Sequence, residues 1–184
     1  MLPSAESLKQ TGGRKLARIV FDEQTIDARV RALGREITAR YPDGDLLVLG
    51  LLKGSFIFLS DLVRRIDRPL QVDFLVAASY GAGTTSGGTV RLFYDPETEL
   101  GGKHIILVED IVETGSTLNR MVALLRDRRP KSLNVCALLH KRMAEHMELE
   151  PAFVGFDCPR DFLVGYGLDH AENFRHLPYI ASLT

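Results

Sequence analysis

Residues 105–117 read IILVEDIVETGST, and this stretch decides the fold that we expect. An apolar strand runs directly into two adjacent carboxylates, Glu109 and Asp110. Two further apolar residues lead to a third carboxylate, Glu113, and to a Thr-Gly-Ser-Thr turn that opens a helix. A strand that passes through a short turn into a helix is the unit from which sheets covered by helices are built.

Strands and helices alternate on both sides of this stretch. Apolar residues recur at helical spacing from Ile26, where Asp22 is placed to cap the N-terminus, and again over residues 58–66 and 118–125. Short apolar runs predict buried strands at residues 46–52, 72–78, 104–108, 133–139, 152–156 and 163–168. The fold class that we expect is α/β, a mostly parallel twisted sheet flanked by helices on both faces.

The chain of 184 residues is long enough for one domain with a substantial core. Residues 1–15 are polar and predict a flexible leader, which leaves a single domain over residues 16–184. Residues 80–103 are rich in glycine and too long for an ordinary connection, which predicts a functional loop with hairpin character.

Composition excludes several classes of function. A formal net charge of −1 argues against a general electrostatic attraction to nucleic acid or to an anionic membrane. No apolar run could span a bilayer, and the N-terminus lacks the apolar stretch of a signal peptide. The 2 cysteines do not make a disulfide framework. We therefore expect a cytoplasmic protein whose partners are neither nucleic acid nor membrane.

The turn at residues 114–117 has the chemistry of a phosphate site. It offers backbone N–H groups and hydroxyls at a helix N-terminus, and Gly115 lets the backbone approach an anion closely. Carboxylates beside a phosphate are reasonable if they hold sugar hydroxyls or face a divalent cation. The stretch predicts a ligand with a ribose, a phosphate and Mg²⁺. The alternative is a capped helix with solvated carboxylates. Walker A and GxGxxG motifs are absent from the sequence, which disfavours the folds that use them.

The stretch resembles the phosphoribosyl pyrophosphate signature of the type I phosphoribosyltransferases. Residues 21–183 are similar to bacterial hypoxanthine-guanine phosphoribosyltransferases, with supporting segments at residues 48–55, 79–81 and 161–169. The resemblance implies that family's fold, with a small hood over the active site. It also implies purine salvage with Mg²⁺ as cofactor: the phosphoribosyl group of phosphoribosyl pyrophosphate passes to N9 of hypoxanthine or guanine, giving IMP or GMP plus pyrophosphate.

The resemblance implies a role for each matched position on the donor side. The ribose hydroxyls would be held by Glu109 and Asp110, and the 5′-phosphate by Thr114, Gly115, Ser116 and Thr117. Pyrophosphate would bind at Leu52, Lys53, Gly54 and Arg175, where the peptide bond before Lys53 can be cis. The metal ligands would be Glu109, Asp110 and Asp169, and a mobile lid would begin at Ser79 and Tyr80.

On the purine side, the resemblance implies that Lys141 donates a hydrogen bond to the oxygen at C6, which disfavours adenine. Phe162 would stack on the purine ring, and the main chain of Leu163 would meet the base edge. Without the resemblance, Lys141 would be a solvated strand-end charge and Phe162 a core residue.

One position departs from the family pattern, which usually has Asp where this chain has Glu113. The family's Asp interacts with N7 of the purine and assists proton transfer. Glu113 keeps the carboxylate on a longer arm, so we expect it to be the proton acceptor. The substitution leaves open the rate and the preference among hypoxanthine, guanine and xanthine.

Two other functions compete with purine salvage. A phosphoribosyltransferase-like regulatory nucleotide sensor would bind RNA with little catalysis, and Glu113 keeps this alternative open. A relative that uses uracil or orotate should lack the combination of Lys141 and Phe162. Family resemblance also implies a homodimer or homotetramer.

Overall fold

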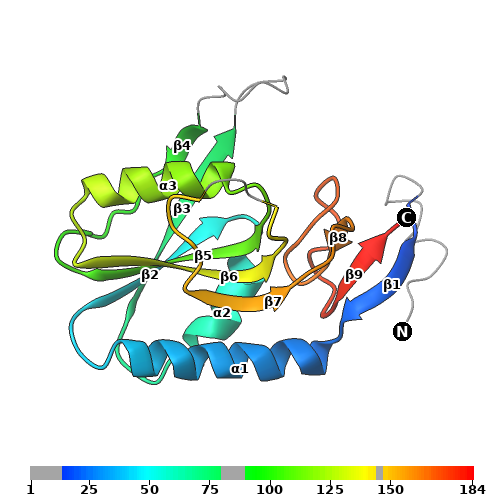
Figure 1. Cartoon of the computed structure of the whole chain (residues 1–184), viewed down its shortest axis with the longest axis horizontal. Helices are drawn as coiled ribbons and strands as arrows, with labels where there is room; N and C mark the ends of the chain where they lie inside the picture. Colours follow the sequence, from blue (N-terminus) through cyan, green and yellow to red (C-terminus); the bar gives the residue numbers. More distant parts are fainter. Residues whose placement is uncertain (1–13, 80–89, 144–146) are drawn as a thin grey trace.

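The structure is a computed structural model, and it describes residues 14–79, 90–143 and 147–184 (Figure 1). Its centre is a six-stranded sheet with the strand order β4-β3-β2-β5-β6-β7. Every neighbouring pair is parallel except β3 and β4. The strands are β2 (Leu46–Leu52), β3 (Gln71–Ser79), β4 (Val90–Tyr94), β5 (His104–Val112), β6 (Ser132–His140) and β7 (Phe153–Asp157).

Helices cover both faces of this sheet, as the alternating pattern predicts. On one face, α1 (Glu23–Arg40) and α2 (Phe56–Val63) pack with Val48, Ile106 and Val108 into one buried cluster. On the other face, α3 (Ser116–Asp127) packs with the intervening residues of β2 and β5. The strand β2 and residues 105–108 of β5 are apolar at every position because their side chains alternate between two covered faces.

The expected N-terminal cap of α1 is confirmed. Asp22 has an extended backbone, and its Oδ1 accepts a hydrogen bond of 2.8 Å from the backbone N–H of Thr25. This satisfies one of the N–H groups that the first turn of a helix leaves without a partner.

A second, three-stranded antiparallel sheet forms the hood. It contains β1 (Leu16–Phe21), β9 (Ile180–Leu183) and β8 (Leu163–Val164), with β9 in the middle. In Figure 1 this sheet lies beyond the ends of β6 and β7. Because β1 pairs with β9, the two ends of the described chain lie side by side in it. The strands β1 and β9 were not predicted from the sequence, and the apolar run at residues 163–168 belongs to this hood and not to the main sheet.

Two further expectations differ from the structure. The prediction that β3 is buried on both faces is wrong, because Val72 is 41% exposed and Phe74 is 37% exposed while Asp73 and Leu75 are buried. The helix α1 packs mainly on β7 and the helix α2 mainly on β2, so neither helix covers this part of β3. In addition, β5 is longer than predicted and runs through both carboxylates to Val112.

The expected hairpin character of residues 80–103 is confirmed where the structure describes them, since β4 pairs antiparallel with β3. Residues 80–89, which include Tyr80 of the expected lid, lie outside the described residues, and so does the expected leader up to residue 13. Ser79 is the last residue of β3. No helix within the described ranges is long and apolar enough to cross a membrane.

Candidate active site

Most of the residues singled out in the sequence lie at the carboxyl ends of three adjacent parallel strands. The segments that follow β2, β5 and β6 carry Lys53, Glu113 and Lys141, respectively. Ligands of open α/β sheets bind at this edge, because parallel strands present all their carboxyl-end loops on the same side. The order β2-β5-β6 in the sheet places β5, which carries Glu109 and Asp110, between the strands that lead to Lys53 and Lys141.

Glu109 and Asp110 lie inside the last part of β5, in a site of low dielectric. Burial, with a smaller contribution from the charge of Asp110, raises the pKa of Glu109 well above its usual value. Burial also raises the pKa of Asp110 to about 6, although a hydrogen bond from the Ile111 N–H and the charge of Arg175 act against it. Buried carboxylates are costly when charged, and a cation or hydroxyl donors from a ligand would relieve that cost.

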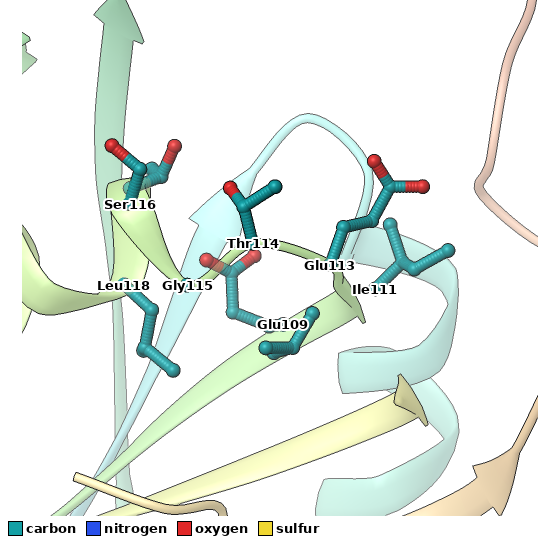
Figure 2. Close-up of a pocket in the computed structure, with 9 residues that line it drawn as sticks. Glu109, Ile111, Glu113, Thr114, Gly115, Ser116 and Leu118 are labelled. Atoms are coloured by element: carbon teal, nitrogen blue, oxygen red, sulfur yellow. The ribbon is translucent and has the colours of Figure 1, made fainter. Parts of the chain in front are cut away.

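The loop after β5 opens α3 as the sequence predicts. Gly115 is the N-cap residue with φ of 75°, a conformation that glycine adopts readily, and the cap makes no side-chain hydrogen bond. The N–H groups of the first turn are therefore available to an anion. Figure 2 shows the carboxylate of Glu109 pointing from β5 toward Thr114, with Glu113 projecting outward beyond it. These residues line one pocket with residues 111–118.

Glu113 and Lys141 are brought together by the neighbouring ends of β5 and β6. Glu113 Oε1 forms an ion pair with Lys141 Nζ. The lysine side chain is only 7% exposed, whereas the Glu113 side chain is 48% exposed. A mostly buried ammonium group next to a solvent-accessible carboxylate presents a donor and an acceptor side by side, which suits a flat ligand with complementary edge groups.

The hood supplies an aromatic surface near this edge. Phe162 is 47% exposed, and its ring meets that of His170 edge to face at a centroid distance of 5.4 Å. The interpretation of Phe162 as a core residue is therefore wrong, since much of the ring faces solvent. Leu163 is buried in β8.

The segment after β2 packs tightly against the acidic strand and the hood. The peptide bond between Leu52 and Lys53 is cis. A Cβ atom added to Gly54 would lie 1.8 Å from Asp110 Oδ2, so only glycine leaves room for that carboxylate. A Cβ atom added to Gly167 of the hood would lie 2.2 Å from the Gly54 carbonyl oxygen. These close approaches bring together the proposed pyrophosphate loop, the acidic strand and the hood.

The remaining predicted residues, Asp169 and Arg175, lie in the hood beside this loop. Arg175 Nη2 forms an ion pair of 2.8 Å with Asp169 Oδ1, and Arg175 Nη1 donates to the Gly167 carbonyl oxygen at 2.7 Å. Glu172 was not predicted from the sequence, and its carboxylate contacts both Lys53 and Arg175. A lone charged residue of a surface turn gives no sequence signal of such a role.

The acidic residues fit a magnesium ion that is shared with a ligand. Within the described residues, no group of three or more His, Cys, Asp or Glu side chains could hold a metal ion. Mg²⁺ is commonly bound by one or two carboxylates together with water and substrate phosphates, so this finding is compatible with the predicted cofactor. The charge of Asp169 contributes to raising the pKa of Asp110, and burial is the largest cause of that rise.

A mostly parallel sheet with a second small sheet beyond its edge, and with carboxylates at the end of β5, is the arrangement of the type I phosphoribosyltransferase fold. Residues 18–171 match the phosphoribosyl transferase domain, and the chain belongs to that family.

Relatives within the family are more specific. The hypoxanthine phosphoribosyltransferase of Salmonella typhimurium is 41% identical over 90% of this chain and 94% of the relative. The hypoxanthine-guanine phosphoribosyltransferase of Dictyostelium discoideum is 46% identical over 90% of this chain and 94% of the relative. A solved hypoxanthine phosphoribosyltransferase from Staphylococcus aureus superimposes with a TM-score of 0.89 at 36% identity, over 99% of this chain and 97% of that chain.

Proposed function

We propose that the chain transfers the phosphoribosyl group of phosphoribosyl pyrophosphate to N9 of hypoxanthine or guanine, releasing pyrophosphate. The observation that carries the proposal is the site around β5. There, buried Glu109 and partly buried Asp110 precede a helix N-terminus whose cap residue is glycine, and the Lys141–Glu113 pair lies beside them. The relatives named above are hypoxanthine phosphoribosyltransferases, and they give no support to the regulatory alternative.

The donor would bind across the loops after β5 and β2. The 5′-phosphate accepts hydrogen bonds from the turn at residues 114–117, where the helix dipole and the N–H groups favour an anion. The ribose hydroxyls donate to Glu109 and Asp110, which supplies polar partners for one buried and one partly buried carboxylate. The pyrophosphate lies against Lys53, Gly54 and Arg175.

The acceptor base would bind between Lys141 and Phe162. The ammonium group of Lys141 donates to the oxygen at C6, and Glu113 accepts or shares the proton at N7. The ring of Phe162 stacks on the purine, and the main chain of Leu163 meets its edge. N9 then attacks C1′ as the bond from C1′ to pyrophosphate breaks, and the positive groups around the pyrophosphate stabilise the charge that develops on it.

Mg²⁺ would be held by one or two of the carboxylates of Glu109, Asp110 and Asp169 together with oxygen atoms of the donor, and it would neutralise charge on the departing pyrophosphate. A lid that begins at Ser79 and Tyr80 would exclude water from the reacting carbon.

The proposal extends to the organisation of the protein. A leader at residues 1–15 would precede a single domain over residues 16–184. A homodimer or homotetramer is supported by large apolar side chains that stay exposed near β3, β4 and the start of α2, namely Phe56, Phe74, Phe93 and Tyr94. A cytoplasmic location is supported by the two free cysteines, Cys136 and Cys158.

The proposed function is tested by measuring Mg²⁺-dependent release of pyrophosphate with hypoxanthine, guanine, xanthine and adenine in turn. We expect turnover with hypoxanthine or guanine and little with adenine. Folded protein that turns over none of the four bases would contradict the proposed activity. Salt-sensitive binding of RNA without turnover would favour the regulatory alternative.

Replacing Lys141 by Met should lower kcat/KM for hypoxanthine by about ten- to hundredfold, the range for losing a hydrogen bond from a charged donor. Methionine is unbranched and only one heavy atom shorter than lysine, so the change removes the ammonium group with little loss of packing. The ratio of hypoxanthine to adenine turnover should fall at the same time. Unchanged discrimination between the two bases in steady-state assays would show that Lys141 does not contact the oxygen at C6.

A further inference from the structure

The hood carries a tight turn whose two central residues, Ala171 and Glu172, conflict with the local preference of the turn. His170 and Asn173 flank it and exchange two backbone hydrogen bonds of 3.2 and 3.1 Å. The φ angles are 50° at Ala171 and 64° at Glu172. Two positive φ angles are characteristic of type I′ turns, which favour Asn and Gly at these positions. Departures from local preference concentrate at functional sites.

The Glu172 carboxylate contacts two cations that come from different segments of the chain. Its Oε2 lies 3.1 Å from Lys53 Nζ in the segment after β2, and both of its oxygens lie 3.4 Å from Arg175 Nη2 in the hood. Lys53 and Arg175 are the two cations that the proposed function assigns to pyrophosphate. In the free protein, the Glu172 carboxylate is therefore paired with the two cationic groups that would bind the phosphates of the ligand.

Arg175 is fixed in place, whereas Glu172 is free to leave. The Arg175 side chain is only 17% exposed and is held by Asp169 at 2.8 Å and by the Gly167 carbonyl oxygen at 2.7 Å. Its Nε is buried and has no hydrogen-bond partner among the described residues. The Glu172 side chain is 65% exposed, so it can turn into solvent without opening the core. Ion pairs this exposed are weak, and a polyanion with several charges can displace the carboxylate.

We propose that Glu172 is an internal counter-ion of the pyrophosphate site, a positioning residue that holds Lys53 and Arg175 in the free protein and leaves them when pyrophosphate binds. The inference rests on the proposed function and adds a residue that sets how tightly pyrophosphate is held. Pyrophosphate is both part of the donor and the released product. An internal competitor lowers its affinity, which favours release of the product, a step that limits turnover in many enzymes.

The test is the Glu172→Gln variant of the full chain, which removes the charge and keeps the size of the side chain. Binding of inorganic pyrophosphate in the presence of Mg²⁺ is measured by isothermal titration calorimetry. We expect Kd to fall by about three- to tenfold, the range for losing two exposed ion pairs. The KM for phosphoribosyl pyrophosphate should fall in the same direction, while the KM for hypoxanthine stays unchanged.

Glu148→Gln is the matched control. The Glu148 carboxylate forms an ion pair of 3.4 Å with Arg126 and is 47% exposed, so the change in charge and the kind of contact are the same. Arg126 lies in the last turn of α3, about three helical turns from the phosphate loop. This variant should bind pyrophosphate as the unchanged protein does, which excludes a general effect of net charge.

The possible results separate the inference from the function on which it rests. An unchanged or weakened affinity of folded Glu172→Gln for pyrophosphate overturns the inference. Glu172→Asp, which keeps the charge on a shorter arm, should raise the affinity by a smaller factor and tests the same point if the glutamine variant does not fold. If the unchanged protein neither binds pyrophosphate nor turns over, the proposed function itself fails. If it does both and the two glutamine variants match it, only the role of Glu172 fails.

Discussion

The Glu113→Gln protein is expected to turn over hypoxanthine about 10²- to 10⁴-fold more slowly than the unchanged protein, the range for losing a general base. Glutamine has nearly the same shape as glutamate, but its amide does not accept a proton at N7. The effect should fall on kcat, because the proton is transferred only as the reaction proceeds. Single-turnover measurements with saturating donor and hypoxanthine provide the readout.

The substitution also removes the ion pair between Glu113 and Lys141, so a second variant is needed. Glu113→Asp keeps a proton acceptor on a shorter arm and should retain much more activity than Glu113→Gln. Equal losses in the two variants would indicate that the ion pair with Lys141 matters and that the proton acceptor does not. A kcat for Glu113→Gln close to that of the unchanged protein would remove Glu113 from the chemistry altogether.

The Gly54→Ala protein is expected to lose about 10²-fold in kcat/KM for phosphoribosyl pyrophosphate while remaining folded. The added methyl group would lie 1.8 Å from Asp110 Oδ2 and has to push that carboxylate away from its place beside the donor. A displacement of about 1 Å at a group that positions substrate is enough for a loss of this size. Gly54 does not have a left-handed φ, so alanine brings no backbone strain of its own.

The control for this prediction is Gly101→Ala, in the turn that precedes β5. A methyl group there would lie 3.8 Å from its nearest neighbour, the Arg128 carbonyl oxygen, which is ordinary van der Waals contact. Gly101→Ala should keep normal kinetics, and thermal melts should show both variants folded. Donor kinetics that are equal for Gly54→Ala and Gly101→Ala would mean that the position of Asp110 does not affect use of the donor.

Helices, strands and caps could be predicted from the sequence wherever they depend on residues that are close along the chain. The strand-to-helix unit around Glu109 and Gly115, the cap at Asp22 and the strand at Leu46–Leu52 were all predicted and are confirmed. The matched positions on both sides of the site came from resemblance, and the structure gathers most of them at one sheet edge. Their individual roles stay predictions that the variants above test.

The strands of the hood and the exposed face of β3 could not be predicted in the same way. The β1 strand is partly exposed at every position, so it lacks the continuous apolar run that predicts a buried strand. It is held by pairing with β9, whose residues lie more than 150 positions away. The residues at 72–78 are apolar enough for a buried strand, and only the placement of the helices over other strands leaves Val72 and Phe74 exposed.

The repeating strands and helices and the acidic, glycine-containing turn of the site follow from patterns of neighbouring residues. The spacing of apolar residues and the residue preferences of helix caps and turns depend on stretches of only a few residues, so they can be recognised in the sequence. Three contacts become visible only in the folded chain: Gly54 leaves room for Asp110, Glu113 pairs with Lys141, and Glu172 reaches Lys53 across 119 residues of chain. Such contacts depend on how whole elements pack, because packing sets the few ångströms on which steric exclusion and ion pairing depend.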